Sequence, residues 1–186
     1  MNSRDADADT DTDTASASVI RTDRLDLVPL AVGHSEEMAG VLADPDLHTF
    51  TGGAPLTGPE LRERYARLAA GSPDPAVTWG NWVVRLRDEG SLTGTVQATV
   101  TTGADGLRTA EVAWVVGTAW QGRGIAGEAA RALVTRLRQD GVDTVIAHVH
   151  PDHKASAAVA AGAGLEPTDE PHDGEIRWRT PARPRT

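Results

Sequence analysis

The feature that most restricts the fold is one change of hydrophobic period near the middle of the chain. Three runs in which apolar and polar residues alternate, 79–87, 92–101 and 109–117, follow one another with short glycine-containing turns between them. A period of two with such turns predicts an antiparallel meander of three strands. Beyond the third run the period becomes four, which predicts an amphipathic helix with apolar positions Ile125, Ala129, Leu133 and Leu137.

Patterns on both sides of this region complete the order of elements. Before the meander they predict a strand and two helices, at 24–30, 35–43 and 57–71. After the long helix they predict a strand, a helix and a strand, at 142–149, 152–163 and 175–178. A capping box is expected at Thr57 and Glu60, and Asp152 is expected to cap the last helix. This order predicts a mixed α/β fold around one sheet, and not a series of βαβ units.

The length of 186 residues is enough for one domain with tails. Residues 1–18 alternate Asp with small residues and offer almost no apolar surface to bury, which predicts a disordered acidic tail. We therefore expect a single domain over 19–180 and a short C-terminal tail over 181–186.

The charge and the composition exclude several classes of protein. Of the net charge of −9, five aspartates and Arg4 place −4 in residues 1–18, so −5 remains for the rest. This acidic excess argues against a nucleic-acid partner, because nucleic-acid-binding proteins carry a basic face. The absence of cysteine excludes disulfides, thiolate zinc sites and a cysteine nucleophile.

The location of the protein is predicted from two further absences. The chain has no run of about 18 to 20 apolar residues, and its N-terminus lacks the basic and apolar regions of a signal peptide. These observations predict a cytoplasmic protein with no membrane partner. A homodimer stays open.

The segment that carries chemistry is the glycine-rich stretch 115–127, between the third meander strand and the long helix. It contains Gly117, Gly122, Gly124 and Gly127, whereas a simple change of direction needs one glycine. Small residues allow main-chain N–H groups to converge on an anion, and the start of a helix adds the positive end of its dipole. The segment is therefore predicted to bind a pyrophosphate without a lysine.

With this segment the chain resembles the GNAT superfamily of acyl-CoA-dependent N-acyltransferases. The signature of that family is Arg or Gln, two residues, Gly, one residue, and Gly or Ala, and it is matched by Gln121, Gly124 and Ala126. The resemblance extends from Arg24 to about Trp178 and includes the order of the elements.

Two further segments carry the resemblance. Residues 151–156 are similar to the second signature of the family, in which a helix contacts the coenzyme. Residues 22–27 look like the opening of the branch that acetylates the N-terminal amines of ribosomal proteins.

The resemblance implies that acetyl-CoA is the co-substrate. It also implies a mostly antiparallel sheet that splays at the coenzyme, with helices on both faces. Val115 and Val116 would pair with the pantetheine like a missing strand, and the amide of Val115 would stabilise the developing oxyanion. The pyrophosphate would be bound by main-chain amides of Gln121, Gly122, Arg123, Gly124, Ile125 and Ala126.

Direct transfer to an amine needs a base for the ammonium and an acid for the departing thiolate. Glu111 matches the strand carboxylate that often serves as base in the family, since it shares a strand face with Val115; the alternative is a surface residue paired with an arginine. Many relatives use a tyrosine of the last signature helix as acid, but the only tyrosine here is Tyr65. Ser156 matches the serine of the family, which implies a hydrogen bond to the coenzyme sulfur; the alternative is a cap of the helix. His153 stands where asparagine usually contacts the pantetheine arm, and it is a candidate acid.

The family forms its acceptor cleft from the two early helices and the loop between them, here 46–53. The expected wall residues are His48, Phe50 and Trp82, with core packing as the alternative for Trp82. A peptide N-terminus, an amino acid, a polyamine and an aminoglycoside-like amine all stay open as acceptors. We expect an N-acetyltransferase that works by direct attack in a ternary complex; the alternative from another class is a non-catalytic module that binds acyl-CoA.

Two patterns favour other functions. Residues 122–127 also satisfy G-x-G-x-x-G, with Asp143 near the position of a ribose-binding acid, which is typical of a nicotinamide or flavin enzyme. Against this, a dinucleotide fold needs several parallel βαβ units. Residues 148–153 (H-V-H-P-D-H) place three histidines together as in a metal site. We expect no metal there, and we expect His150 to border the coenzyme.

Overall fold

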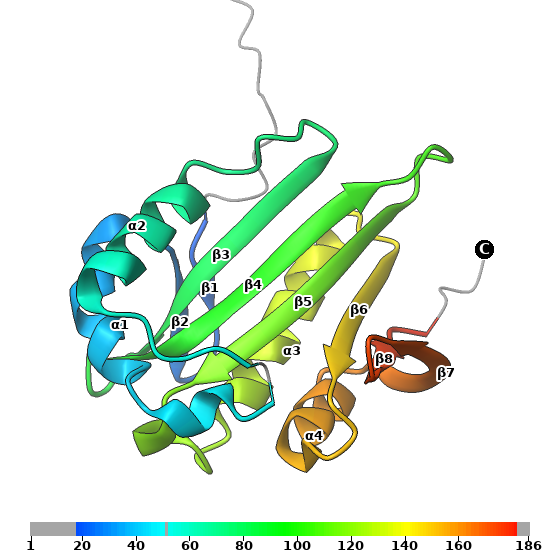
Figure 1. Cartoon of the computed structure of the whole chain (residues 1–186). Helices are drawn as coiled ribbons and strands as arrows, with labels where there is room; N and C mark the ends of the chain where they lie inside the picture. Colours follow the sequence, from blue (N-terminus) through cyan, green and yellow to red (C-terminus); the bar gives the residue numbers. More distant parts are fainter. Residues whose placement is uncertain (1–17, 51, 182–186) are drawn as a thin grey trace, which may run out of the picture.

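One twisted sheet organises the part of the chain that this computed structural model describes, residues 18–50 and 52–181 (Figure 1). Its strands lie in the order β1-β2-β3-β4-β5-β6-β8-β7. Their bounds are β1 Ile20–Arg21, β2 Leu25–Pro29, β3 Val77–Leu86, β4 Leu92–Thr102, β5 Arg108–Val116, β6 Thr144–Val149, β7 Glu166–His172 and β8 Glu175–Arg179. The expected acidic tail up to residue 17 and the expected C-terminal tail from residue 182 lie outside the described residues, as does Thr51.

The predicted meander of β3, β4 and β5 forms the centre of the sheet, and its strands pair antiparallel. Among the described strands the one parallel pair is β5 with β6, and it is short, from Thr109↔Thr144 to Glu111↔Ile146. The mixed α/β fold is therefore confirmed. A dinucleotide fold would need several parallel βαβ units, so the topology contradicts the interpretation of 122–127 as a dinucleotide motif.

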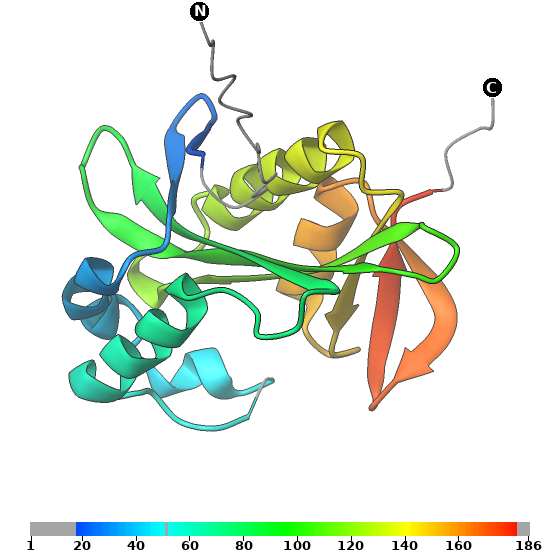
Figure 2. The same cartoon turned by 90° about the horizontal axis from the view of Figure 1, so that it is seen from above.

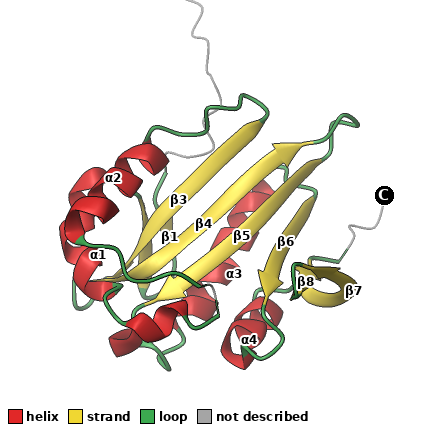
Figure 3. Cartoon of the chain, viewed as in Figure 1, coloured by secondary structure: helices red, strands yellow, loops and turns green. Residues whose placement is uncertain are grey.

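Helices cover both faces of the sheet (Figures 2 and 3). In Figure 2, α1 and α2 lie on one side and α3 on the other. The bounds are α1 Ser35–Val41, α2 Gly58–Ala69, α3 Ile125–Gln139 and α4 Lys154–Gly162, with short 3₁₀ turns η1 Val32–His34, η2 Pro45–His48 and η3 Thr118–Trp120. In residues 18–50 and 52–181, no helix combines the length and the apolar character needed to cross a bilayer.

Two predicted N-caps can be compared with the observed starts of α2 and α4. The capping box at the start of α2 is confirmed, because the Thr57 hydroxyl accepts from the amide of Glu60 while the Glu60 carboxylate accepts from the amide of Thr57. The prediction that Asp152 caps α4 is wrong. The cap is His153, whose Nδ1 accepts from the amide of Ser156 at 3.4 Å.

The sheet separates two apolar cores of unequal size. The larger lies against α3 and includes Leu25, Leu27, Val96, Ala129, Leu133 and Val145. The smaller lies against α1 and α2 and consists of Met38, Val41, Leu61, Tyr65, Val83 and Leu92. The smaller core covers only part of its face, so the side chains of Asn81 and Gln97 stay half-buried and that of Ala113 is exposed. This uncovered part of the sheet is where the candidate site lies.

Candidate active site

β5 and β6 pair near one end and then separate. The last paired residues are Glu111 and Ile146, whereas β5 continues to Val116. Figure 1 shows the two strands diverging toward the lower end of the view, with α4 below β6. The part of β5 beyond Glu111 has a free edge on this side within the described chain, and a free strand edge can pair with an extended ligand.

The main-chain groups of β5 point alternately to its two neighbours. On the β4 side, the amide of Gly117 donates to the carbonyl of Thr93 at 2.8 Å. On the β6 side, the carbonyl of Arg108 accepts from the amide of Asp143 at 2.9 Å. The register between β4 and β5 is unbroken from residue 108 to 116. In a regular antiparallel ladder, odd-numbered residues of β5 therefore bond to β4 and even-numbered residues face the opening.

This alternation corrects one expected role. Val115 lies opposite Thr95, and its N–H and C=O groups are directed to β4. The expected oxyanion contact from the amide of Val115 is therefore not available, because that amide faces away from the opening. The main-chain groups of Trp114 and Val116 face the opening, so both can pair with an extended ligand there.

The glycine-rich segment adjoins the end of this free edge. Gly122 and Gly124 have φ of +73° and +75°, a region that residues with a Cβ rarely adopt. Gly124 is the N-cap of α3 and contributes no side-chain cap, so the first amides of the helix, at Ile125 and Ala126, are left for a ligand. For Ile125 and Ala126 this arrangement suits an anion such as the expected pyrophosphate, since these amides and the helix dipole favour negative charge. The amide of Gln121, which was expected to bind the pyrophosphate too, donates instead to the carbonyl of Thr118 at 3.3 Å.

Side chains from distant turns hold this segment in place. Arg24 pairs with Glu128 at 2.8 Å and donates through Nη1 to the carbonyl of Arg123 at 3.1 Å. Burial raises the pKa of Glu128, but hydrogen bonds from Thr22 and Arg24 bring that pKa below its ordinary value. The side chain of Arg123 is turned outward to Glu89, at 2.5 Å. Residues 22–24 thus fix the start of α3.

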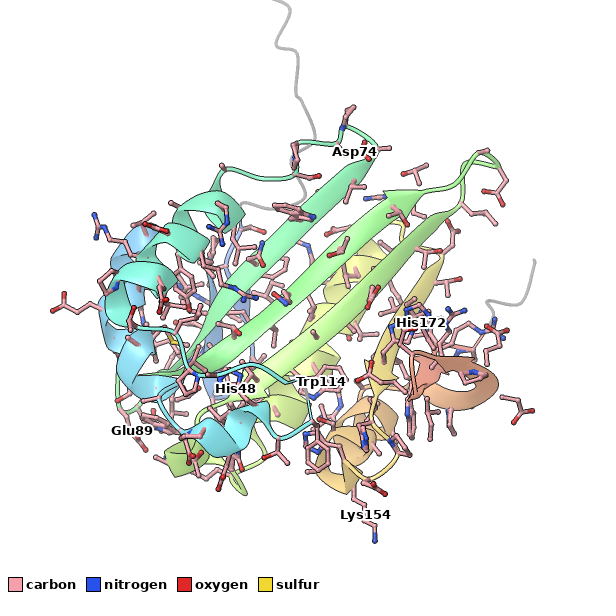
Figure 4. The ribbon with its side chains drawn as sticks, viewed as in Figure 1. His48, Asp74, Glu89, Trp114, Lys154 and His172 are labelled. Atoms are coloured by element: carbon pink, nitrogen blue, oxygen red, sulfur yellow. The ribbon has the colours of Figure 1, made fainter. Side chains whose placement is uncertain are left out.

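A cavity of about 1070 Å³ extends from the glycine-rich segment along the opening to α2. Of the expected site residues, it is lined by Val115, Val116, Gln121, Gly122, Gly124, Ile125, Ala126, His153, Ser156, His48 and Phe50. Figure 4 shows Trp114, another lining residue, between the lower end of β5 and α4.

Three expected site residues do not line the cavity: Arg123, Glu111 and Trp82. Trp82 is 3% exposed and belongs to the core against α3. Its Nε1 donates to the carbonyl of Ser18 at 3.3 Å. Trp82 is therefore a core residue, which was its alternative role, and not a wall residue of the cavity.

Glu111 does not line the cavity itself, but it contacts His148, which does. Oε1 of Glu111 lies 3.0 Å from Nδ1 of His148, and Nε of Arg177 lies 3.3 Å from Nε2 of His148. Because a guanidinium can only donate, Nε2 accepts and the ring proton sits on Nδ1, where it is donated to Glu111. Arg177 is held in turn by Glu170 at 2.7 Å. His148 lines the cavity and is only 9% exposed, whereas Glu111 is 55% exposed.

An aromatic contact bridges the opening. The ring of Phe50, from the loop after η2, stacks on His153 with centroids 4.3 Å apart and lies 5.2 Å from His150. Burial, and the neighbouring His150, lower the pKa of His153 from its ordinary value of 6.5. At neutral pH the ring of His153 is therefore mostly without its extra proton, which suits a cap and a stacking partner better than an acid.

Ser156 is joined to β5 across the same opening. Its Oγ accepts a hydrogen bond from Nε1 of Trp114 at 3.3 Å. Since the indole can only donate, the hydroxyl hydrogen of Ser156 is free to point into the cavity.

The three histidines of 148–153 have separate partners. His148 bonds to Glu111, Nδ1 of His150 accepts from the amide of Asp152 at 3.2 Å, and His153 caps α4. Within the described ranges, no group of three or more His, Asp or Glu side chains is arranged to hold a metal ion. His150 lines the cavity.

Sequence reasoning missed several residues of this site. His148 and Arg177 come together only because β8 lies beside β6. Tyr65 lines the cavity with a hydroxyl that has no hydrogen-bond partner in the described chain. Strand pairing and burial were the signals that could have found them, and neither can be read from local periodicity.

Comparison with known proteins identifies the same architecture. Residues 24–166 match the family model described as acetyltransferase (GNAT) domain. A GNAT-family acetyltransferase from Bacillus anthracis is 20% identical, with a TM-score of 0.70 over 87% of this chain and 96% of that one. An acetyltransferase from Agrobacterium tumefaciens is 26% identical, with a TM-score of 0.66 over 88% and 94%. RimL, a ribosomal-protein alpha-N-acetyltransferase in complex with coenzyme A, is 13% identical, with a TM-score of 0.69 over 87% and 97%. No match was found among curated proteins.

Proposed function

This chain belongs to the GNAT family of acetyltransferases, and we propose that it transfers an acetyl group from acetyl-CoA to a primary amine by direct attack in a ternary complex. The observation that carries the proposal is the free edge of β5 beside the glycine-rich start of α3. RimL, which has the same fold, was solved with coenzyme A. Acetyl-CoA supplies an activated thioester to this opening.

The opening offers two kinds of main-chain contact to the coenzyme. The groups of Val116 that face the opening suit pairing with an extended amide-containing arm. The amide of Trp114, on the same edge, is the donor best placed to stabilise negative charge on the thioester oxygen. At the other end of the cavity the amides of Ile125 and Ala126 suit a pyrophosphate.

Glu111 is the proposed base. Its Oε1 is engaged by His148, and Oε2 has no partner in the described part of the chain, so it is free to take a proton from the acceptor ammonium directly or through water. The net reaction replaces the C–S bond of the thioester by a C–N bond. Of the two protons that the ammonium loses, one ends on the thiol and one in solvent.

Ser156 is the proposed donor to the departing sulfur. Its hydroxyl hydrogen is free, because its oxygen accepts from Trp114. His153 remains beside it, but the lowered pKa of His153 leaves little of the ring protonated at neutral pH. We therefore assign the donor role to Ser156, and we assign to His153 the cap of α4 and the contact with Phe50.

The experiment that tests this function is a shift in unfolding temperature with acetyl-CoA, NAD or zinc added separately. A ligand at about 100 times its Kd adds ~2.7 kcal/mol, which moves the unfolding temperature of a domain of this size by roughly 5 to 10 °C. We expect a shift with acetyl-CoA alone, followed by thiol release when an acceptor amine is added. A shift with acetyl-CoA and no thiol release from any amine would favour a non-catalytic acyl-CoA-binding module.

We place the activity in the cytoplasm, where cell fractionation would find it, and we expect no nucleic-acid partner. A homodimer is to be tested by light scattering at several protein concentrations.

A further inference from the structure

The residues around the transfer point form a row across the sheet. Ala113 lies on the open face of β5, between Glu111 and Val115, and its side chain is small and exposed. Its neighbour in β4 is Gln97, and the neighbour of Gln97 in β3 is Asn81. Neighbouring strands are about 4.8 Å apart, so Gln97 and Asn81 lie roughly 5 and 10 Å from Ala113.

This row leads away from the reacting amine. An amine that attacks beside the amide of Trp114 and gives its proton to Glu111 must lie over Ala113. His148 lies on the other side of Ala113 from Gln97. It belongs to β6, two residues after Ile146, which pairs with Glu111 in the sheet. The substituents of the amine therefore extend the other way, over Gln97 and Asn81 and toward α2.

The polar groups along this path are neutral and unused. The side-chain amides of Gln97 and Asn81 line the cavity and make no hydrogen bond within the described chain. Tyr65, on α2, is 2% exposed, and its hydroxyl has no partner there either. Burial raises the pKa of Tyr65 to about 12, so the hydroxyl keeps its proton and can donate. A buried polar group without a partner is costly, so the Tyr65 hydroxyl is the group of this path that most needs a bond from a ligand, while the half-buried amides of Gln97 and Asn81 are open to one.

The charged residues that line the cavity argue against an acceptor with several positive charges. Among the described lining residues the carboxylates are Asp46 and Glu175, which belong to η2 and β8 and not to the path over β4 and β3. The cation on the α2 side is Arg64, which forms no ion pair in the described chain. A polyamine or an aminoglycoside carries several positive charges and needs carboxylates spaced along its binding path. This path offers amides, a phenol and a guanidinium instead.

From this geometry we infer that the acceptor carries a carbonyl group next to its reactive amine, as an amino acid or a peptide N-terminus does, and that Gln97, Asn81 and Tyr65 bind this part of the acceptor. The inference rests on the proposed function, because it concerns the acceptor of the same reaction. Primary amides present a donor and an acceptor together and so match a peptide group. Arg64 can pair with the carboxylate of a free amino acid, so we expect a free amino acid to require Arg64 for binding and a peptide amide not to require it.

The first test compares four acceptors at equal concentration with the full-length protein and acetyl-CoA. They are tetrapeptide amides randomised at the first two residues, a mixture of free amino acids, spermidine and an aminoglycoside. We expect thiol release with the peptides or the amino acids to exceed that with spermidine and the aminoglycoside by at least about tenfold. Arg64→Gln separates the two sources, because it should abolish activity on free amino acids and spare activity on peptide amides.

The second test changes the charge of the path. Asn81→Asp combined with Gln97→Glu keeps the size of both side chains and adds two carboxylates. We expect the ratio of kcat/KM for spermidine to that for the peptide or amino-acid substrate to rise at least about tenfold. Thr101→Glu is the matched control, because it adds a carboxylate to an exposed position of the same strand, outside the cavity lining. The unfolding-temperature shift with acetyl-CoA shows that each variant is folded.

The outcomes distinguish a failure of the proposed function from a failure of the inference about the acceptor. A wild-type protein that shows neither a thermal shift with acetyl-CoA nor thiol release refutes the proposed function itself. A normal shift with release from spermidine or the aminoglycoside alone overturns only the inference about the acceptor. A normal shift with no release from any of the four acceptors overturns that inference too, and it favours a non-catalytic acyl-CoA-binding module over the proposed function.

Discussion

Nδ1 of His148 lies 3.0 Å from Oε1 of Glu111, so a buried imidazole on β6 and an exposed carboxylate on β5 form one unit across the opening of the sheet. The imidazole is held from behind by Arg177, which is itself paired with Glu170. One carboxylate oxygen is thus fixed and the other is free. This is the arrangement expected of a base whose orientation matters.

Glu111→Gln should remove the base and keep the shape of the side chain. Because general base catalysis contributes on the order of 10²–10⁴ in rate, we expect kcat to fall by roughly 100-fold or more. The thermal shift with acetyl-CoA should stay as in the wild type, since the coenzyme contacts are elsewhere. Glu166→Gln, at an exposed position of β7, is the control and should not change kcat. An unchanged kcat in Glu111→Gln would remove Glu111 from the mechanism.

His148→Ala should lower kcat through the loss of orientation of Glu111. We expect a decrease of about tenfold in kcat with little change in the KM for acetyl-CoA, which corresponds to one hydrogen bond to a charged group. His148→Asn should restore much of kcat, because the Asn amide nitrogen can occupy the place of Nδ1 and donate to Glu111. If Asn and Ala at this position reduce kcat equally, His148 does not act by positioning Glu111.

Gly124→Asp should abolish the binding of acetyl-CoA. The residue has φ +75°, and an added Cβ would approach Nη2 of Arg24 to 3.5 Å while a carboxylate would repel the pyrophosphate. Gly106→Asp is the matched control, because Gly106 has φ +78° and open space in the β4–β5 turn, far from the cavity lining. Both variants carry the same backbone strain and charge, so retained acetyl-CoA affinity in Gly124→Asp would contradict the pyrophosphate site.

Ser156→Ala should slow the departure of the thiol. We expect kcat to fall by about tenfold. Trp114→Phe removes the same Trp114–Ser156 hydrogen bond but keeps the hydroxyl, so its effect on kcat should be smaller. A larger loss in Trp114→Phe than in Ser156→Ala would show that the bond between the two side chains, and not the hydroxyl, is what matters.

The sequence was sufficient where local patterns decide the structure. The capping box at Thr57 depends on a residue three positions away, and the helix from Ile125 on a period that is visible in the chain. The strand β7 was missed because its sequence is polar and contains Pro167 and Pro171, which a sheet tolerates at its edge and next to an irregular register. Its formation depends on pairing with β8, and no local pattern in its own sequence indicates that pairing.

The site shows the same limit. Periodicity correctly places the side chains of Glu111 and Val115 on one face, but it does not tell which edge of the strand their amides face. That direction is set by the register of the hydrogen bonds with β4, which turns the amide of Trp114, and not that of Val115, toward the opening. The partner of Glu111 depends in the same way on which strand lies next to β5.

His153 should make the stability of the protein depend on pH near neutrality. Burial and His150 lower its pKa in the folded state, so the unfolded chain binds the proton more readily than the folded one. Stability is therefore complete above the unfolded pKa of about 6.5 and is lost as the pH falls through that value toward the lower folded pKa. His34, whose pKa is lowered by burial and by Arg85, adds to the loss with the same sign.

The measurement is the unfolding temperature of the wild type and of His153→Asn between pH 7.5 and 5.5. Asparagine is a good N-cap, so the variant keeps a side-chain acceptor for the amide of Ser156 and removes only the titrating group. We expect the unfolding temperature of the wild type to fall more steeply toward pH 5.5 than that of the variant, with the remaining slope of the variant due to His34. Carboxyl groups titrate below this window and do not obscure the comparison. Parallel curves for the two proteins would mean that burial and His150 do not lower the pKa of His153 in the folded protein.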